Sequence, residues 1–249
     1  MPDHLEASLN RANALIALVT RTCPATVHST LQLDDWNVYA PVSVTRCAYS
    51  IESIVRLRDR EVDAGILLRS LVDHAITFAW VAADPTPRLR RVIASEFQKR
   101  LAANRNMEDL TGVPWLPVAR VEHFEQYIQE VGGLAPDART MASQADQSWL
   151  SCFPDLSAQY GFGGIYAVCF RHFSAYVHPT TSGLQAFVTD AVDGGLAIGP
   201  PSTDHDCVGL ASSVFGLQLH VCSEIMGWPG NDQINQIFET YPNPLARRE

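Results

Sequence analysis

Lysine is almost absent from this sequence. Lys99 is the only lysine among 18 basic residues, and arginine supplies the others. With 27 acidic residues the formal net charge is −9, which disfavours non-specific binding of nucleic acid by the whole surface. The charge is uneven, because residues 85–105 hold six cations and one acidic residue. This segment is typical of a solvated helix face, and local binding of phosphate is the alternative.

Paired metal ligands are also missing. The six cysteines contain no Cys-x-x-Cys pair, which excludes a zinc ribbon and a thioredoxin motif. No Glu-x-x-His occurs, so the ligands of a di-iron helical bundle are absent. Glu122 and His123 are adjacent and point to different helix faces, and His172 and His178 diverge by about 120° on a helix. We therefore predict no metal site, no cofactor, and reduced cysteines in the core.

Long apolar runs and the short motifs of common enzyme classes are missing as well. No run of 18 apolar residues occurs, and the first residues lack the basic region of a signal peptide. We therefore expect a soluble cytoplasmic protein with no membrane contact. There is no Gly-x-Ser-x-Gly, no Walker sequence and no Gly-x-Gly-x-x-Gly. These absences disfavour an α/β-hydrolase, a P-loop enzyme and a dinucleotide-binding enzyme.

Apolar residues make up 47% of the chain and recur mostly with helical spacing. We predict an all-α protein, a multi-helix bundle in a single domain over residues 1–249, with its core at about 40–182. The alternation around Asp193-Gly194-Gly195 predicts one small β-hairpin at 186–198. The polar tail after residue 226 is expected to fray, with Ile237, Phe238 and Tyr241 as its docking points. The helices are predicted at 3–21, 42–58, 61–83, 87–110, 118–130, 137–148, 165–179 and 204–226, with a loop at 28–41.

The predicted helix at 61–83 is apolar on nearly all sides, which is typical of a central helix. Its polar residues are therefore informative. Arg69 and Asp73 are spaced i, i+4 and can form an ion pair, as buried charges require. One interpretation is an internal pair that fixes the position of the helix. The other is that both residues orient polar groups on the helix at 165–179.

The predicted helix at 165–179 carries the most informative polar residues. Arg171, Ser174 and His178 recur at i, i+3 and i+7, which places them on one stripe of a helix. Pro179 ends the helix, and the glycine-rich segment 161–164 precedes it. That segment could present backbone amides to an anion, although a turn is the better interpretation because no strand precedes it.

The Arg-x6-His spacing of Arg171 and His178, with the polar His172 after the arginine, resembles the motif of the HEPN superfamily. That motif lies near the end of a late helix in an all-helical domain. Together with the segment 68–85, the pattern resembles an uncharacterised bacterial family of helical proteins with HEPN-like features, over roughly residues 40–200. The sequence departs from that pattern at Asp73, where glutamate is usual.

This resemblance implies metal-independent cleavage of RNA, in phage defence or in a toxin–antitoxin pair. His178 would be the general acid or base and Arg171 the phosphate clamp. The supporting residues would be Arg69, Asp73, Ser174, His172 and Tyr166. The resemblance also implies a homodimer that buries the stripe and part of the central helix. Helix geometry points the same way, because Arg171 and His178 would be about 10.5 Å apart along an ideal helix and a second copy would bring in a second pair. RNA and an antitoxin or regulatory protein are the other expected partners.

Other interpretations remain open at this point. His178 caps the helix end in one of them, where a cation is favoured, and Arg171 pairs with Asp73 or another buried acid. Ser174 and Tyr166 then serve packing and hydrogen bonding. The corresponding function is that of a non-catalytic helical module for interaction, regulation or binding of a small ligand. An enzyme that acts on a small molecule at the same face is a third possibility.

Overall fold

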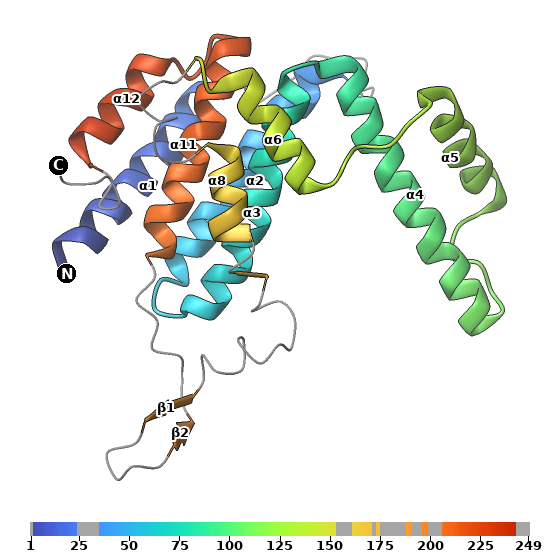
Figure 1. Ribbon diagram of the computed structural model, residues 1–249, viewed down its shortest axis with the longest axis horizontal. Coiled ribbons are helices and arrows are strands. Elements are labelled where there is room, and N and C mark those ends of the chain that lie inside the picture. The colour runs from blue at the N-terminus through green and yellow to red at the C-terminus, as the bar shows by residue number, and fades with distance from the viewer. Residues whose placement is uncertain are drawn as a thin grey trace.

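The computed structural model describes residues 2–23, 35–152, 161–170, 173–174, 188–190, 196–198 and 206–242. These residues are predominantly helical, as the sequence predicts. Figure 1 shows a bundle of helices from which an arm made of α4 and α5 extends, with α1 and α12 on the far side of the bundle. The main helices are α1 (Pro2–Thr22), α2 (Trp36–Arg56), α3 (Glu61–Ala82), α4 (Pro85–Thr111), α5 (Val118–Val131), α6 (Ala138–Trp149), α11 (Cys207–Met226) and α12 (Asn231–Thr240).

Helix α3 lies at the centre of the bundle. It contacts α2, α4, α6 and α11. Its buried side chains include Leu68, Leu71, Phe78 and Trp80, which are at most 1% exposed. The helix is apolar on nearly all sides because it has packing partners around most of its circumference. The Trp80 indole donates to Gln144 Oε1 at 2.6 Å, which joins α3 to α6.

Two helices, at 62–82 and 207–226, are long and apolar enough to cross a membrane by length and composition alone. Most of each apolar window is buried inside the protein, and α3 and α11 pack against each other. Packing within the bundle therefore accounts for their apolar composition. Such helices are weak indicators of a membrane span, because core helices of globular proteins have the same character.

Helices α4 and α5 form the arm. The beginning of α4 contacts α3 and α2, and α5 packs along α4 away from the bundle (Figure 1). The Phe97 ring of α4 stacks on the Phe124 ring of α5 with centroids 4.0 Å apart, and the edge of Tyr127 meets Phe97 at 5.2 Å. Gly112 ends α4 with φ of 69°, the left-handed conformation that glycine adopts without strain. The arm thus has a small aromatic core of its own.

Helix α2 begins earlier than the sequence predicts. It starts at Trp36 and contains Pro41, whereas the sequence predicts a loop over 28–41. Asp35 caps the helix by accepting from the Asn37 amide at 2.8 Å. Pro41 lies only five residues from the helix start, so few intrahelical bonds are lost. Residues 24–34 lie outside the described part of the chain.

Residues 231–240 form helix α12, which corrects the expectation of a frayed tail for this part of it. Helix α12 packs on α11 and α1, and its Ile234 is fully buried. The Phe238 ring lies directly over Gly216 of α11. A Cβ at Gly216 would clash with the Phe238 ring carbons. The absence of a side chain there is what lets α12 approach α11 so closely.

A buried arginine joins the first helix to the last two. Arg11 is fully buried and donates from Nε to Ser212 Oγ at 2.8 Å. Its Nη1 and Nη2 donate to the carbonyls of Tyr241 and Gly209 at 3.1 and 3.3 Å. Burial lowers the pKa of the guanidinium to about 10, and the nearby Asp206 carboxylate partly offsets this. Arg11 is thus a polar anchor of the fold that the sequence did not reveal.

Strand β1 (Val188–Asp190) pairs antiparallel with β2 (Leu196–Ile198). Thr189 faces Ala197 in the register. The remaining residues of the hairpin predicted at 186–198 lie outside the described part of the chain.

The cysteines are only partly as expected. All six are free, and four are buried: Cys47, Cys169, Cys207 and Cys222. Cys23 is half-buried. Cys152 is exposed, because it follows the last turn of α6 instead of lying within a core helix.

Candidate functional site

The helix predicted at 165–179 begins earlier and is not a uniform α-helix. It starts as α8 (Phe162–Ile165) and continues as a π-helical segment, η1 (Tyr166–Phe170). Phe173 and Ser174 are again α-helical. A π-segment is wider than an α-helix and occurs frequently at functional sites. Three residues of the predicted site, Arg171, His172 and His178, lie outside the described residues.

An internal carboxylate occupies the backbone amides at the start of α8. Asp146 of α6 accepts from the Phe162 amide at 2.6 Å and from the Gly163 amide at 2.9 Å. A Cβ at Gly161 would be 2.6 Å from Asp146 Oδ1, and a Cβ at Gly163 would be 2.8 Å from Oδ2. Burial raises the pKa of Asp146, and the two amides oppose that effect. The anion that this glycine-rich segment binds is therefore part of the same chain.

Ser174, one of the predicted supporting residues, contacts the central helix. Arg69 of α3 donates from Nε to Ser174 Oγ at 2.9 Å. Both side chains are half-buried, as is Tyr166 in the π-segment. The π-segment itself contacts α3 and α6. At Ser174, therefore, the predicted stripe faces α3 of the same chain.

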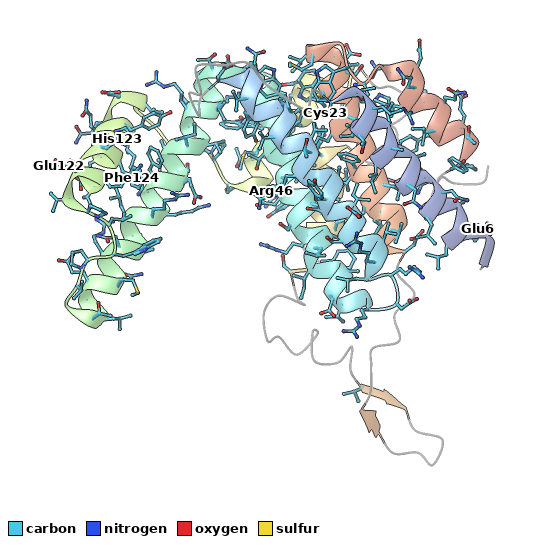
Figure 2. The ribbon with its side chains drawn as sticks, turned by 180° about the vertical axis from the view of Figure 1, so that it is seen from behind. Glu6, Cys23, Arg46, Glu122, His123 and Phe124 are labelled. Atoms are coloured by element: carbon cyan, nitrogen blue, oxygen red, sulfur yellow. The ribbon has the colours of Figure 1, made fainter. Side chains whose placement is uncertain are left out.

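Asp73 has different surroundings from Arg69, although the two are spaced i, i+4. It lines a cavity of about 940 Å³ between the bundle and the arm. Residues of α2, α3, α4 and the start of α6 form the walls, and apolar side chains supply much of them. This volume is within the range of small-molecule sites. Figure 2 shows Arg46 on the side of the bundle that faces the arm, with His123 and Phe124 on the arm itself.

Three ionisable groups interact on the bundle side of this cavity. Burial lowers the pKa of His74, the Arg46 cation lowers it further, and the Asp73 carboxylate opposes both effects. His74 Nε2 is buried without a hydrogen-bond partner among the described residues. Burial also raises the pKa of the neighbouring Tyr39 phenol above its usual range. His74 and Tyr39 are therefore neutral at pH 7, and Arg46 and Asp73 are the charged groups of this wall.

The cations of residues 85–105 have two kinds of surroundings on α4. Arg88 and Arg90 are engaged with aromatic rings, since their guanidinium carbons lie 5.0 Å from the Trp80 ring and 5.6 Å from the Tyr127 ring. Lys99 and Arg100 instead line the cavity. Arg100 forms an exposed ion pair with Glu96 at 3.4 Å. The expectation of a uniformly solvated face is thus wrong for the first half of α4.

Sequence reasoning missed the cavity residues Arg46, His74 and Lys99 as a group. They come from three helices, and no short spacing joins them. Of the predicted site residues that the structure describes, only Asp73 lies in the cavity. Among the described residues, no group of three or more His, Cys, Asp or Glu side chains could hold a metal ion.

Comparison with protein families gives a match over a large part of the chain. Residues 40–196 match the family of unknown function DUF5677, which is more than half of the chain. The chain belongs to the DUF5677 family. No curated protein and no solved structure matches it. The expected membership of an uncharacterised family is therefore confirmed, and the finer HEPN-like assignment remains a proposal.

The DUF5677 region begins within α2 and ends within β2. It includes the Arg69–Ser174 contact and the Asp146 cap. It also includes every residue of the cavity wall except Tyr39. Helices α1, α11 and α12 lie outside the DUF5677 match, and α11 supplies the long apolar partner of α3.

Proposed function

We propose that this protein is HEPN-like and cleaves RNA without a metal ion, with Arg171 and His178 as its catalytic pair. The observation that supports the proposal is the hydrogen bond from Arg69 to Ser174. In the sequence, Ser174 lies between Arg171 and His178 on one helical stripe. The hydrogen bond holds Ser174 against the central helix. A catalytic pair on the same stripe needs support of this kind to be positioned.

The chemistry follows from the two side chains. The imidazole of His178 accepts the proton of a ribose 2′-hydroxyl, and the 2′-oxygen attacks the adjacent phosphorus. The bond from phosphorus to the 5′-oxygen breaks, and that oxygen takes the proton from the His178 imidazolium as it leaves. The guanidinium of Arg171 stabilises the charge that develops on the phosphoryl oxygens. The products are a 2′,3′-cyclic phosphate and a 5′-hydroxyl, and no water or metal enters this step.

Replacing His178 by alanine is expected to lower the cleavage rate about 10²–10⁴-fold, because this is the usual contribution of one general acid or base. The assay uses total RNA and tRNA in the presence of EDTA, with end-group analysis of the fragments. His123→Ala, on the arm, is the matched control and retains the wild-type rate. Equal cleavage by wild type and His178→Ala would refute the assignment. So would fragments that carry 5′-phosphates, because they require attack by water.

We further propose that the protein acts as a homodimer. On an ideal α-helix, two residues spaced i, i+7 like Arg171 and His178 are about 10.5 Å apart along the axis, so a second copy can supply the complementary pair to one phosphate. Helix α3 and the π-segment that contacts it also carry exposed apolar side chains. Ile66 of α3 is 37% exposed and Val168 of the π-segment is 54% exposed. A second copy would cover these side chains.

Light scattering at micromolar concentration, in reducing buffer, is expected to give twice the 27.4 kDa mass of one chain. Val168→Asp places a charge in the proposed interface and should give a monomer. Val113→Asp changes a valine on the arm that is 65% exposed, and should remain dimeric. A wild-type monomer removes the composite site. A dimer that Val168→Asp does not affect uses another surface.

The second candidate function is binding of a small ligand. The observation that favours it is the cavity of about 940 Å³, whose walls combine apolar side chains with charged side chains of both signs. The cavity residues are distinct from Arg171 and His178, so the two functions can be tested separately.

A further inference from the structure

We propose that the end of the arm docks on a zwitterionic lipid bilayer and inserts its apolar side chains among the lipids. This arm tip consists of residues 110–119, which join the last residues of α4 to the first residues of α5. In Figure 1 it lies at the end of the arm that is remote from the bundle. Docking at this end goes beyond RNA cleavage, and it is independent of Arg171, His178 and the proposed dimer interface.

Large apolar side chains of the arm tip are exposed to solvent. Leu110 is 82% exposed, Val118 is 71% exposed and Trp115 is 61% exposed. Val113, which lies between them in the sequence, is exposed as well. The other four tryptophans of the chain are buried or half-buried. A cluster of exposed apolar side chains of this kind marks a surface that contacts a protein or a membrane.

The backbone of the arm tip has hydrogen-bond partners within the chain. The Leu116 amide donates to Asn104 Oδ1 at 2.5 Å, and the Asn104 side chain is only 5% exposed. Two more amides of the turn donate to groups of the same turn or of α4, those of Gly112 and Val113. The turn also contains two prolines, which have no amide hydrogen, Pro114 and Pro117. These positions therefore need no water as an acceptor, and transfer into a lipid interface leaves no donor unpaired there.

Charged side chains of both signs flank the arm tip. Residues 110–119 themselves carry no charge. The exposed charges on either side are Arg105, Glu108, Asp109, Arg120 and Glu122, two cations and three carboxylates. A zwitterionic headgroup carries one phosphate and one cationic amine, so it can pair with both signs. An anionic surface attracts polybasic segments instead, and the arm tip is not flanked by one.

The shape of the arm tip also favours a bilayer over a protein. A protein partner would need a groove that encloses a protruding turn, whereas lipids rearrange around it (Figure 1). At 1.5 Å per residue, the flanking charges lie within about 10 Å of the tip along the helix axes, and interfacial elements are buried about 5–10 Å. Tryptophan is enriched at this depth. The expected absence of membrane contact followed from the lack of a long apolar run, a criterion for spans and not for docking turns.

Flotation with phosphatidylcholine vesicles tests this docking on the full-length protein. The wild type is expected to float with the vesicles. Val113→Asp and Val118→Asp should each lower the partition coefficient about 10–100-fold, the factor that burial of one valine side chain contributes. Aspartate is favourable in the first turn of a helix, so Val118→Asp should leave α5 folded. Tyr49→Asp is the matched control, because Tyr49 is 65% exposed on α2 of the bundle, and it should float like the wild type.

Fluorescence of Trp115 provides the independent measurement. Vesicles are expected to shift its emission to shorter wavelength, and brominated phosphatidylcholine should quench it. Trp115→Phe keeps an apolar ring, so it should still float but lose most of the shift. Absence of flotation would overturn the proposal and leave a protein groove as the occupant of the arm tip. Flotation that neither aspartate substitution weakens, or binding to phosphatidylglycerol vesicles alone, would also overturn it, because another surface would then make the contact.

Discussion

Replacing Arg11 by methionine is expected to lower the free energy of unfolding by about 3–5 kcal/mol, the usual cost of removing one partner from a buried polar cluster. Arg11 is fully buried and donates to Ser212 Oγ and to the carbonyls of Gly209 and Tyr241. Its removal takes one donor from each of these acceptors, of which the Gly209 carbonyl keeps the Ser212 and Ser213 hydroxyls, and it deprives Asp206 of an interacting cation. Methionine fills much of the volume but supplies no donor.

Urea unfolding followed by circular dichroism gives the measurement for Arg11. The control is Arg21→Met, which changes an exposed arginine in the last turn of the same helix. It should alter stability by no more than about 0.5 kcal/mol. A loss of less than about 1 kcal/mol for Arg11→Met would show that α1 does not depend on this anchor.

Replacing Gly161 by alanine is expected to cost about 2–3 kcal/mol, because it displaces a carboxylate from two backbone amides. The new Cβ would be 2.6 Å from Asp146 Oδ1, a separation that requires Asp146 to move. Once displaced, Asp146 no longer accepts from Phe162 and Gly163, and the start of α8 loses its cap. The same helix leads into the π-segment, so RNA cleavage should fall together with stability.

A double-mutant cycle isolates this contact. Asp146→Ala alone should cost a similar amount, and the combination of Gly161→Ala with Asp146→Ala should cost little more than either, because the clash and the bonds disappear together. Gly164→Ala is the control, since nothing lies within 4 Å of its Cβ position. It should be neutral or stabilising by up to about 1 kcal/mol. Additive losses in the cycle would mean that Gly161 and Asp146 act independently.

The helical character of this protein could be predicted from local patterns, because helix positions follow from the spacing of apolar residues. The central position of α3 followed in the same way, from an apolar surface on nearly all sides. The errors occurred where distant residues decide the outcome. Helix α12 has a polar sequence and depends on Phe238 packing over Gly216 of another helix. The cap of α8 comes from Asp146, which precedes Phe162 by 16 residues, so no local capping rule detects it.

The candidate site was likewise predicted where local spacing decides and missed where distant residues come together. Spacing along one helix identified Ser174 as part of a polar stripe, and the structure joins it to Arg69 across 105 positions of sequence. The cavity could not be predicted, because Arg46, Asp73 and Lys99 meet only when the arm is placed against the bundle. The cations of 85–105 illustrate this limit, since periodicity alone does not show that Arg88 and Arg90 lie on aromatic rings while Lys99 faces the cavity.

The distribution of the thiols has a practical consequence for work with the purified protein. Burial raises the pKa of the Cys47 and Cys222 thiols to about 12 and that of Cys169 to about 11, so these side chains resist alkylation and oxidation at neutral pH. Cys152 is exposed and is the preferred site of both reactions. Stored in air, the protein should form covalent pairs through Cys152 that reductant disperses. A maleimide dye should label the same position selectively and leave the core intact.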